Sequence, residues 1–197
     1  MITLFGLAGS GKGTQGKALS EIFGWHWLSV GEVIRQTGEY KDIIDRGELI
    51  PDADVIKLMN KQIEKSESEG FDVILDGYPR DKEQAEWLVS HMLDKLDGAI
   101  ILEVPKDELL ERLTLRGRDD DKERSSIERR FEIFEQNICS ILPLFEKHNI
   151  PIKRVNGVGA VEEVTARLVE VIKEINPQAT EQTNDVNGGE IEKSYGE

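Results

Sequence analysis

The sequence predicts an α/β domain in which helices cover both faces of a mostly parallel sheet. Short apolar runs, typical of buried strands, alternate along residues 1–175 with longer amphipathic stretches, typical of helices. This alternation indicates βαβ units, whose parallel strands need crossover connections. A glycine-rich turn directly follows the first strand, and ligands of such sheets bind beyond the carboxyl ends of the strands.

Each predicted element has its own pattern. The candidate strands are short apolar runs at residues 2–5, 72–75, 99–104 and 150–155. The helical stretches carry apolar residues three or four positions apart, at about 12–23, 52–66, 82–95, 107–116, 123–147 and 160–174. The two kinds of segment follow one another along the whole region, as a doubly covered sheet requires.

Length and composition narrow the class of protein. A chain of 197 residues suits one domain with a hydrophobic core. The single cysteine, Cys139, excludes a disulfide framework and a cysteine-cluster zinc site. No apolar run is long enough to span a bilayer, and the N-terminal residues lack a signal-peptide pattern. A cytoplasmic protein without membrane contact is therefore expected.

The charge balance raises a question about the ligand. The chain has 25 basic and 39 acidic side chains, which gives a formal net charge of -14 at pH 7. Such a chain lacks the basic face that nucleic-acid binding requires, so no nucleic-acid partner is expected. If the ligand is an anion, positive charge has to be gathered locally.

Residues 176–197 differ in character from the rest. They hold four apolar side chains without periodicity, and five acidic residues against one basic residue. Such a segment buries too little apolar surface to offset the entropy of ordering it. The sequence therefore predicts a domain at 1–175 and a disordered acidic tail at 176–197, with a partner-binding segment as the alternative for the tail.

The clearest motif is a phosphate-binding loop at residues 6–12, with the sequence GLAGSGK. It matches G-x-x-x-x-G-K, whose glycines let backbone N–H groups curl around a phosphate at a helix N-terminus. Lys12 supplies a point charge to the outer phosphates. The strict motif has Ser or Thr after the lysine. Here Gly13 intervenes and Thr14 follows, so contact of this hydroxyl with a metal is expected through water.

The extended segment GLAGSGKGTQ resembles the phosphate-binding loop of adenylate kinases and other nucleoside monophosphate kinases, with Ala8 where the family usually has Pro. The resemblance covers about residues 1–174. It implies a P-loop NTPase fold, three layers of α/β/α type around a mostly parallel five-stranded sheet. It also implies a helical monophosphate-binding insertion at about 29–58 and a short lid at about 116–124. In such a protein, ATP contacts Gly9, Ser10, Gly11, Lys12, Gly13 and Thr14.

Three further segments resemble the acceptor side of this family, namely LSVGEVIR at 28–35, GELIPD at 47–52 and LDGYPR at 75–80. Arg35 and Arg80 can each present a fork of donors to a phosphate, although either alone could form a surface ion pair. The Asp76 carboxylate suits Mg²⁺ held through water. The resemblance implies acceptor contacts at Val30, Arg35, Glu48, Leu49, Ile50, Gly77, Tyr78, Pro79, Arg80 and Gln84.

Two residues bear on the acceptor base. Val30 stands where adenylate kinases usually have Thr and pyrimidine monophosphate kinases commonly have Ala. Val lacks the hydroxyl, and one neutral hydrogen bond is worth about 0.5–1.5 kcal/mol. Gln84 offers a donor and an acceptor together, which suits an adenine edge. AMP is therefore the predicted acceptor, with UMP or CMP as the alternative.

Residues 112–130 hold six of the eleven arginines of the chain, which supplies the local positive charge. This stretch resembles the lid of short-lid family members, so no zinc is expected. The resemblance implies that Arg112 packs on the donor base, that Arg116 contacts donor phosphates, and that Arg118 and Arg130 hold the transferring phosphoryl group.

Other readings of this region stay open. The spacing is one residue off the usual register, so Arg124 and Arg129 are alternatives to Arg118 and Arg130. Helical pairs such as Arg124–Glu128 could also be plain surface salt bridges. The late turn at 156–160 matches the family segment whose backbone, near Gly159, meets the donor adenine, although a plain turn would have the same sequence.

These residues predict reversible phosphoryl transfer from Mg·ATP to a nucleoside monophosphate, ATP + AMP = 2 ADP. The acceptor phosphate is already an anion, so catalysis needs positioning and charge stabilisation rather than a general base. Mg²⁺ is the expected cofactor and the chain is expected to act as a monomer. Two alternatives are a nucleotide sensor without transferase activity and a kinase for a sugar-like hydroxyl, which would need a general base. The predicted catalytic residues are Lys12, Arg80, Arg118 and Arg130.

Overall fold

The computed structural model describes residues 1–37, 40, 43, 50–117, 121 and 123–181. Its centre is a five-stranded sheet in the order β2-β3-β1-β4-β5, and all neighbouring strands are parallel. The predicted α/β class and parallel sheet are confirmed. The strands are β1 (Ile2–Phe5), β2 (His26–Ser29), β3 (Val73–Asp76), β4 (Gly98–Glu103) and β5 (Ile152–Asn156).

The edge strand β2 is the one strand of this sheet that its sequence pattern did not predict. Its residues, HWLS, include no β-branched side chain, and all four are half-buried instead of alternating between buried and exposed. The strand forms because it pairs with β3, in a register that places Trp27 beside Ile74 and Ser29 beside Asp76. Pairing with β3, and not the local sequence pattern, therefore determines that these four residues form a strand.

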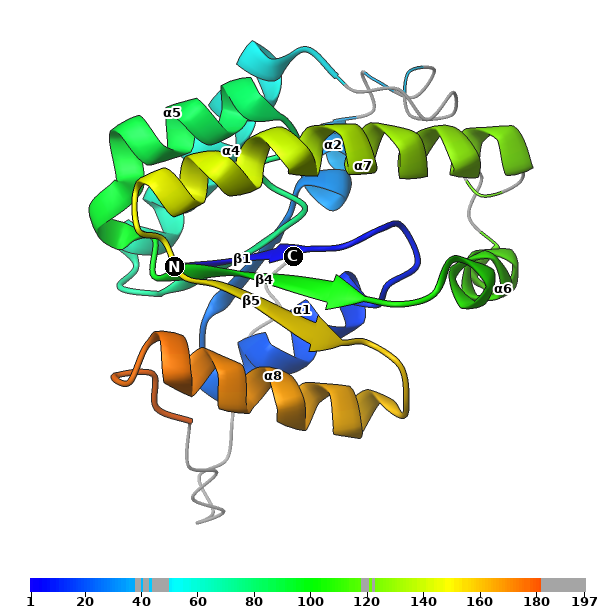
Figure 1. Cartoon of the computed structure of the whole chain (residues 1–197). Coiled ribbons are helices and arrows are strands. Elements are labelled where there is room, and N and C mark those ends of the chain that lie inside the picture. Colours follow the sequence, from blue (N-terminus) through cyan, green and yellow to red (C-terminus); the bar gives the residue numbers. More distant parts are fainter. Residues whose placement is uncertain (38–39, 41–42, 44–49, 118–120, 122, 182–197) are drawn as a thin grey trace, which may run out of the picture.

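Helices cover both faces of the sheet, as predicted (Figure 1). α1 and α8 lie on one face, and α4, α5 and α7 lie on the other. The helices are α1 (Lys12–Phe23), α2 (Val30–Thr37), α4 (Asp52–Ser68), α5 (Lys82–Met92), α6 (Lys106–Arg116), α7 (Arg124–Lys147) and α8 (Val161–Ile175), with the 3-10 turn η1 at Leu93–Lys95.

The strands divide their side chains between two cores, because successive residues of a strand point to opposite faces. In β4, Ile100 packs toward α1 and α8, while Ala99 and Ile101 pack toward α5 and α7. Buried apolar runs of this kind are typical of parallel strands covered on both sides. A third, smaller core joins α6 and α7 to the loop after β1, through Leu109, Leu113, Ile127 and Phe131.

The chain between α2 and α4 belongs to the predicted insertion and lies largely outside the described residues, as do residues 118–120 and 122 of the predicted lid. At the other end, Ala179 is buried against the core under α8, and Lys173 pairs with Glu181. The first residues of the segment assigned to the tail therefore pack on the domain. The disorder of 182–197 stays a prediction.

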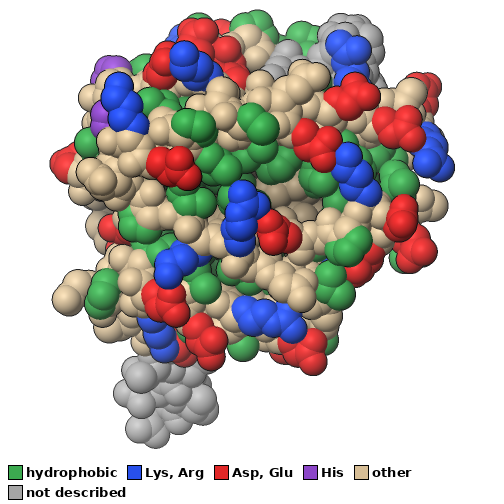
Figure 2. Space-filling model, in the orientation of Figure 1, with side chains coloured by type: hydrophobic (Ala, Val, Ile, Leu, Met, Phe, Trp, Pro, Cys, Tyr) green, Lys and Arg blue, Asp and Glu red, His purple; other side chains and the backbone are tan. Residues whose placement is uncertain are grey.

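Basic and acidic side chains are interspersed over the face in Figure 2, and the basic ones do not gather there into one patch. No helix among the described residues is long and apolar enough to cross a membrane. The positive charge that an anionic ligand needs is found instead inside a cavity.

Candidate active site

A cavity of about 700 Å³ opens where β1, β2 and β3 end. Among its described lining residues, seven are basic and two, Glu32 and Asp76, are acidic. This local excess of positive charge answers the question raised by the acidic chain as a whole. The predicted site residues that line it are Gly9, Ser10, Gly11, Lys12, Gly13, Thr14, Arg35, Ile50, Asp76, Gly77, Pro79, Arg80, Arg112, Arg116, Arg130 and Gly159.

The loop between β1 and α1 has the backbone of a phosphate cradle. Gly6, Gly9 and Gly11 have φ angles of 152°, 85° and 96°, which L side chains rarely adopt. At Gly6 a Cβ would also lie 2.8 Å from the carbonyl oxygen of Leu102, so only glycine fits. The loop leads directly into the N-terminus of α1, where unpaired N–H groups attract anions.

Lys12 begins α1 and turns its side chain back over this loop. Its Nζ donates to the carbonyl oxygens of Gly6 at 2.6 Å and of Leu7 at 3.0 Å. Burial lowers the pKa of Lys12 to about 8. Asp76 opposes this shift, and Arg80, Arg116 and Arg130 reinforce it. Cations crowded in this way favour the binding of a polyanion, which would relieve their mutual repulsion.

Asp76 ends β3 and is buried at the floor of the cavity. Burial raises the pKa of Asp76 above its ordinary value, and Lys12, Arg80 and the polar hydrogens of Trp27 and Ser29 oppose that rise without cancelling it. The residue is thus a buried oxygen donor surrounded by groups that favour its charged form. That is the chemistry of a carboxylate that holds Mg²⁺ through water.

Arg35 and Arg80 come together from α2 and from the turn after β3. A Cβ built on Gly31 would lie 3.3 Å from the Arg35 guanidinium and 3.5 Å from that of Arg80, so both guanidinium groups border one small space. The Nε of Arg80 donates to the Gly77 carbonyl oxygen at 3.1 Å, which orients its fork. Two forks around one space suit a phosphate.

Two arginines of the cluster, one from α6 and one from α7, converge on one buried carboxylate. Arg116 donates to Asp121 through Nε at 2.7 Å and through a terminal nitrogen at 2.8 Å, and Arg130 donates to it at 2.7 Å. The Asp121 side chain is 1% exposed. Burial alone would raise its pKa, but the hydrogen bonds from both arginines outweigh burial and hold the pKa below its ordinary value.

The alternatives in the arginine cluster separate clearly. Arg130 lines the cavity, whereas Arg129 is exposed. Arg124 is 75% exposed and pairs with Glu128 at 2.8 Å, as in the surface-pair reading. Arg118 lies outside the described residues.

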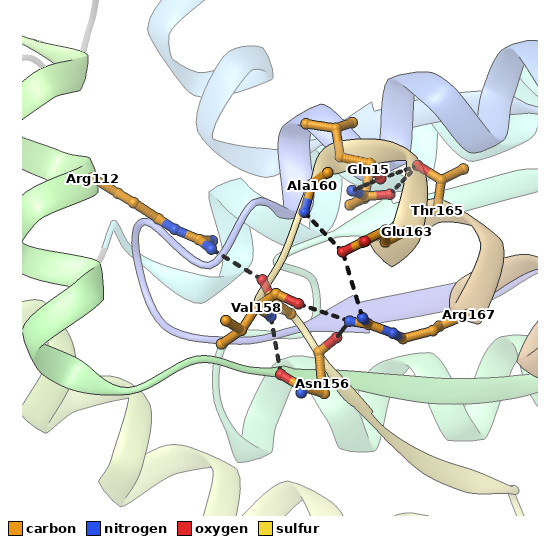
Figure 3. Close-up of polar contacts among 10 residues, drawn as sticks. Gln15, Arg112, Asn156, Val158, Ala160, Glu163, Thr165 and Arg167 are labelled. Atoms are coloured by element: carbon orange, nitrogen blue, oxygen red, sulfur yellow. Dashed lines mark hydrogen bonds and ion pairs between the residues drawn. The ribbon is translucent and has the colours of Figure 1, made fainter.

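The far end of the cavity is formed by the turn between β5 and α8, shown in Figure 3. Arg112 reaches this turn from α6 and donates to the Gly157 carbonyl oxygen at 3.1 Å. Arg167 donates to the carbonyl oxygens of Asn156 at 2.9 Å and Val158 at 2.8 Å. These bonds tie the turn to two helices, so its backbone can serve as a fixed recognition edge near Gly159.

A second set of contacts in Figure 3 joins this turn to the phosphate loop. The Gln15 amide donates to the Val161 carbonyl oxygen at 3.1 Å, and the Thr165 hydroxyl donates to Gln15 at 2.7 Å. The start of α1 and the start of α8 are therefore held together beneath the cavity.

Three predicted acceptor residues do not line the cavity. Val30 is fully buried in the core, because as the first residue of α2 it packs against neighbouring apolar side chains. Tyr78 and Gln84 are also fully buried. Two others, Glu48 and Leu49, lie outside the described residues. The roles of these five residues stay predictions.

The Gln84 side chain is engaged by protein groups on all sides. Its amide nitrogen donates to Asp52 at 2.7 Å and to Asp81 at 2.9 Å, and its oxygen accepts from the backbone N–H of Arg80 at 2.9 Å. Burial, then contact with Asp52, raises the pKa of Asp81 to about 7. In this conformation Gln84 ties the start of α4 to the start of α5, and its amide N–H groups already donate to two carboxylates.

Several residues that line the cavity were not predicted from the sequence. Trp27 and Ser29 line it from β2, the strand that was not predicted, and Lys17 and Glu32 line it from α1 and α2. One wall is apolar and comes from α7 through Ile133, Phe134, Ile138 and Ile141. Apolar residues three to five apart on a long helix could have indicated a buried stripe, but not which part of it faces a ligand.

Comparisons with known proteins agree with this geometry. The family model described as "Adenylate kinase" matches residues 4–150. The adenylate kinase of Flavobacterium psychrophilum is 34% identical over 190 residues, which cover 88% of this chain and 98% of that protein. That of Mycolicibacterium smegmatis is 37% identical over 183 residues, 87% and 98% of the two chains. That of Thermus thermophilus is 33% identical over 182 residues, 85% and 94%. With this match over most of its length, and with a phosphate loop that opens into an arginine-lined cavity, the chain belongs to the adenylate kinase family.

Proposed function

We propose that the chain catalyses ATP + AMP = 2 ADP in the cavity described above. One observation carries the proposal: basic side chains from α1, α2, the turn after β3, α6 and α7 converge on a single glycine-lined phosphate loop. Two polyanionic substrates repel each other, and catalysis of their reaction requires positive charge held in place on both sides of the transferred group.

On the donor side, the loop N–H groups and Lys12 bind the outer phosphates of ATP. The Lys12 ammonium exchanges its carbonyl partners in the loop for phosphate oxygens, and an anion nearby raises its pKa from about 8, so it stays protonated at neutral pH. Arg112 and the turn near Gly159 lie where they can meet the donor base.

On the acceptor side, Arg35 and Arg80 bind the phosphate of AMP through their paired forks. This neutralisation lets the acceptor oxygen approach the outer phosphorus of ATP. Arg116 and Arg130, released from Asp121, stabilise the charge of the phosphoryl group in transit. No general base is needed, because the attacking oxygen carries no proton that must leave.

Mg²⁺ fits the donor set of this site. Asp76 provides a buried carboxylate in the cavity, and Thr14, an exposed residue in the first turn of α1, lines the same cavity. Both would hold the ion through its water shell, and the ion would neutralise charge on the ATP phosphates. Every proposed substrate contact comes from one chain, so we also propose a functional monomer, which light scattering of the purified protein can check.

A coupled assay of ATP against AMP, UMP, CMP and GMP tests the reaction. We expect AMP to be the preferred acceptor, because the relatives named above are adenylate kinases. Higher kcat/KM for UMP or CMP than for AMP would contradict the proposal in favour of the pyrimidine alternative. No transfer to any of the four would favour a nucleotide sensor.

The variant Arg80→Ala sharpens the same assay. We expect a loss of 10²–10⁴-fold in kcat/KM for AMP, since a guanidinium that opposes charge in the transition state is worth several kcal/mol. Arg154→Ala is the matched control, because Arg154 pairs with Glu103 on the surface and does not line the cavity. Near-normal activity of Arg80→Ala would overturn the acceptor assignment.

A further inference from the structure

Trp27 lies beside the proposed magnesium carboxylate although no motif of the sequence pointed to it. In the register of β2 and β3, Trp27 pairs with Ile74 and Ser29 pairs with Asp76. Residues two apart on a strand point to the same face, so Trp27 and Asp76 are diagonal neighbours on the face covered by α1. Both line the cavity.

The helix α1 is shaped to receive this indole. A Cβ on Gly16 would lie 2.3 Å from both Cδ1 and Nε1 of Trp27, closer than any side chain allows. A Cβ on Gly13 would lie 3.5 Å from Trp27 Cζ2 and 3.7 Å from Asp76 Oδ2. The indole and the carboxylate therefore meet over the first turn of α1, and Lys17 covers the ring at 4.9 Å from its centroid.

The polar atom of this indole is an exception to ordinary packing. Trp27 Nε1 is buried and has no partner in hydrogen-bond geometry among the described residues. A buried N–H without an acceptor is unfavourable, and such groups in native proteins call for an explanation. The candidate acceptor is the Asp76 carboxylate, because the N–H of Trp27 and the O–H of Ser29 both favour its charged form.

We propose that Trp27 is a positioning residue for Asp76. Its indole N–H engages one carboxylate oxygen when nucleotide and metal are bound, which leaves the other oxygen for the water shell of Mg²⁺. The inference rests on the proposed function, and it adds a residue that holds the metal-directed carboxylate in one orientation. Groups that orient a metal-directed side chain typically change metal affinity by 10–100-fold when they are removed.

Binding of Mn²⁺, a paramagnetic substitute for Mg²⁺, tests the proposal without turnover. Electron paramagnetic resonance reports free Mn²⁺ in a titration of the full chain with a non-hydrolysable ATP analogue. For Trp27→Phe, which keeps a ring but removes the N–H, we expect about tenfold weaker Mn²⁺ binding. Affinity for the analogue without metal should stay within twofold.

Two further variants separate positioning from packing. Trp25→Phe is the matched control, because Trp25 is buried two residues away and stacks on Phe23 with ring centroids 5.0 Å apart. It should leave Mn²⁺ affinity unchanged. Gly16→Ala keeps the indole N–H but displaces the ring, and it should weaken Mn²⁺ binding in the same direction as Trp27→Phe.

A double variant connects Trp27 to Asp76 directly. If Trp27 acts through Asp76, Trp27→Phe should have no additional effect on Mn²⁺ affinity in an Asp76→Asn background. Additive effects, or unchanged Mn²⁺ affinity in both Trp27→Phe and Gly16→Ala, would overturn the positioning role. Failure of the wild-type chain to bind Mn²⁺ with the analogue would instead contradict the proposed function.

Discussion

Lys12 and the pair of Arg116 and Arg130 share one cavity, but their charges are held in opposite ways. Lys12 donates to neutral carbonyl oxygens of its own loop, and its pKa falls to about 8 because burial and neighbouring cations disfavour the charge. The two arginines share the buried carboxylate of Asp121, five and nine residues away in the chain. Among the described contacts, the charge of Lys12 is therefore uncompensated by a direct ion pair, although Asp76 lies near enough to favour it. The charges of Arg116 and Arg130 are neutralised by a bonded carboxylate.

This difference indicates how each end receives a phosphate. At Lys12 an incoming anion replaces neutral dipoles and relieves repulsion among cations, so binding is favoured from the start. At the lid the same anion must displace a carboxylate whose hydrogen bonds are charge-assisted and about twice as strong as neutral ones. Under the proposed function, the loop would bind phosphate directly, and Arg116 and Arg130 would become available only when Asp121 releases them.

The largest expected effect comes from removing the uncompensated charge. Lys12→Met should lower kcat by several orders of magnitude, because the amine is bonded to the phosphate loop itself. The melting temperature should stay equal or rise, because the folded protein lowers the pKa of Lys12 and so disfavours the ammonium that the variant removes. Steady-state kinetics and thermal unfolding test both parts, and a large loss of stability would contradict the picture of an uncompensated cation.

The second-largest effect is expected from removing the charge of Asp121, the carboxylate that binds Arg116 and Arg130. Asp121→Asn should tighten binding of an ATP analogue by about three- to tenfold, since the competing carboxylate charge is removed. Stability at pH 7 should fall by about 1–3 kcal/mol, because charge-assisted bonds are lost. Asp121 has a lowered pKa in the folded protein, so this deficit is present above the unfolded pKa and disappears as the pH falls through the folded pKa.

Calorimetric titration and urea unfolding at pH 7 and pH 3 measure the two parts of this prediction. Glu128→Gln is the matched control, because Glu128 pairs with Arg124 on the surface. Weaker nucleotide binding by Asp121→Asn would mean that Asp121 organises the lid arginines instead of competing for them.

A smaller effect on stability is expected at Asp81, a carboxylate that lies against a second carboxylate. Asp81 lies against Asp52, and its pKa is raised to about 7. Between the unfolded pKa near 3.9 and pH 7 the folded state binds the extra proton, so stability from this group declines as the pH rises through that window. Asp81→Asn should raise the melting temperature at pH 8 by about 2–4 °C and change it little at pH 4, because the half-exposed group contributes at most about 1 kcal/mol.

Thermal unfolding across pH 4–8 measures this difference, with Asp54→Asn as the control because Asp54 is held by the Tyr40 hydroxyl at 2.8 Å. An equal gain in melting temperature for Asp81→Asn at both pH values would contradict the raised pKa of Asp81.

The smallest effect is expected at Arg124. This residue is 75% exposed and pairs only with Glu128 among its described ion-pair contacts, so Arg124→Ala should leave the midpoint of urea unfolding nearly unchanged. The kcat of the Arg124→Ala variant should stay within twofold of that of the unsubstituted protein. A kcat loss of tenfold or more would place Arg124 in the phosphoryl-transfer machinery and weaken the assignment of Arg130.

The sequence predicted best where the chemistry is local. The phosphate loop reads directly from residues 6–14, since one contiguous turn supplies both the glycines and the lysine. Trp27, which lines the cavity, and Asp121, which binds two arginines that line it, were harder to predict. Their surroundings come from distant elements: Trp27 sits under α1 through Gly16, and Asp121 joins Arg116 to Arg130. Gln84 illustrates the same point, since its motif suggested a base contact while its neighbours engage its whole amide.

By itself the sequence determined the α/β class, the phosphate loop and the identity of the basic residues, because periodicity, glycine placement and charge are properties of the chain. The tertiary structure alone decided which cations are neutralised, which predicted contacts are buried, and that an edge strand places Trp27 beside Asp76. Charge compensation and burial depend on distances between segments far apart in the chain, and those distances exist only once the sheet and its helices have packed.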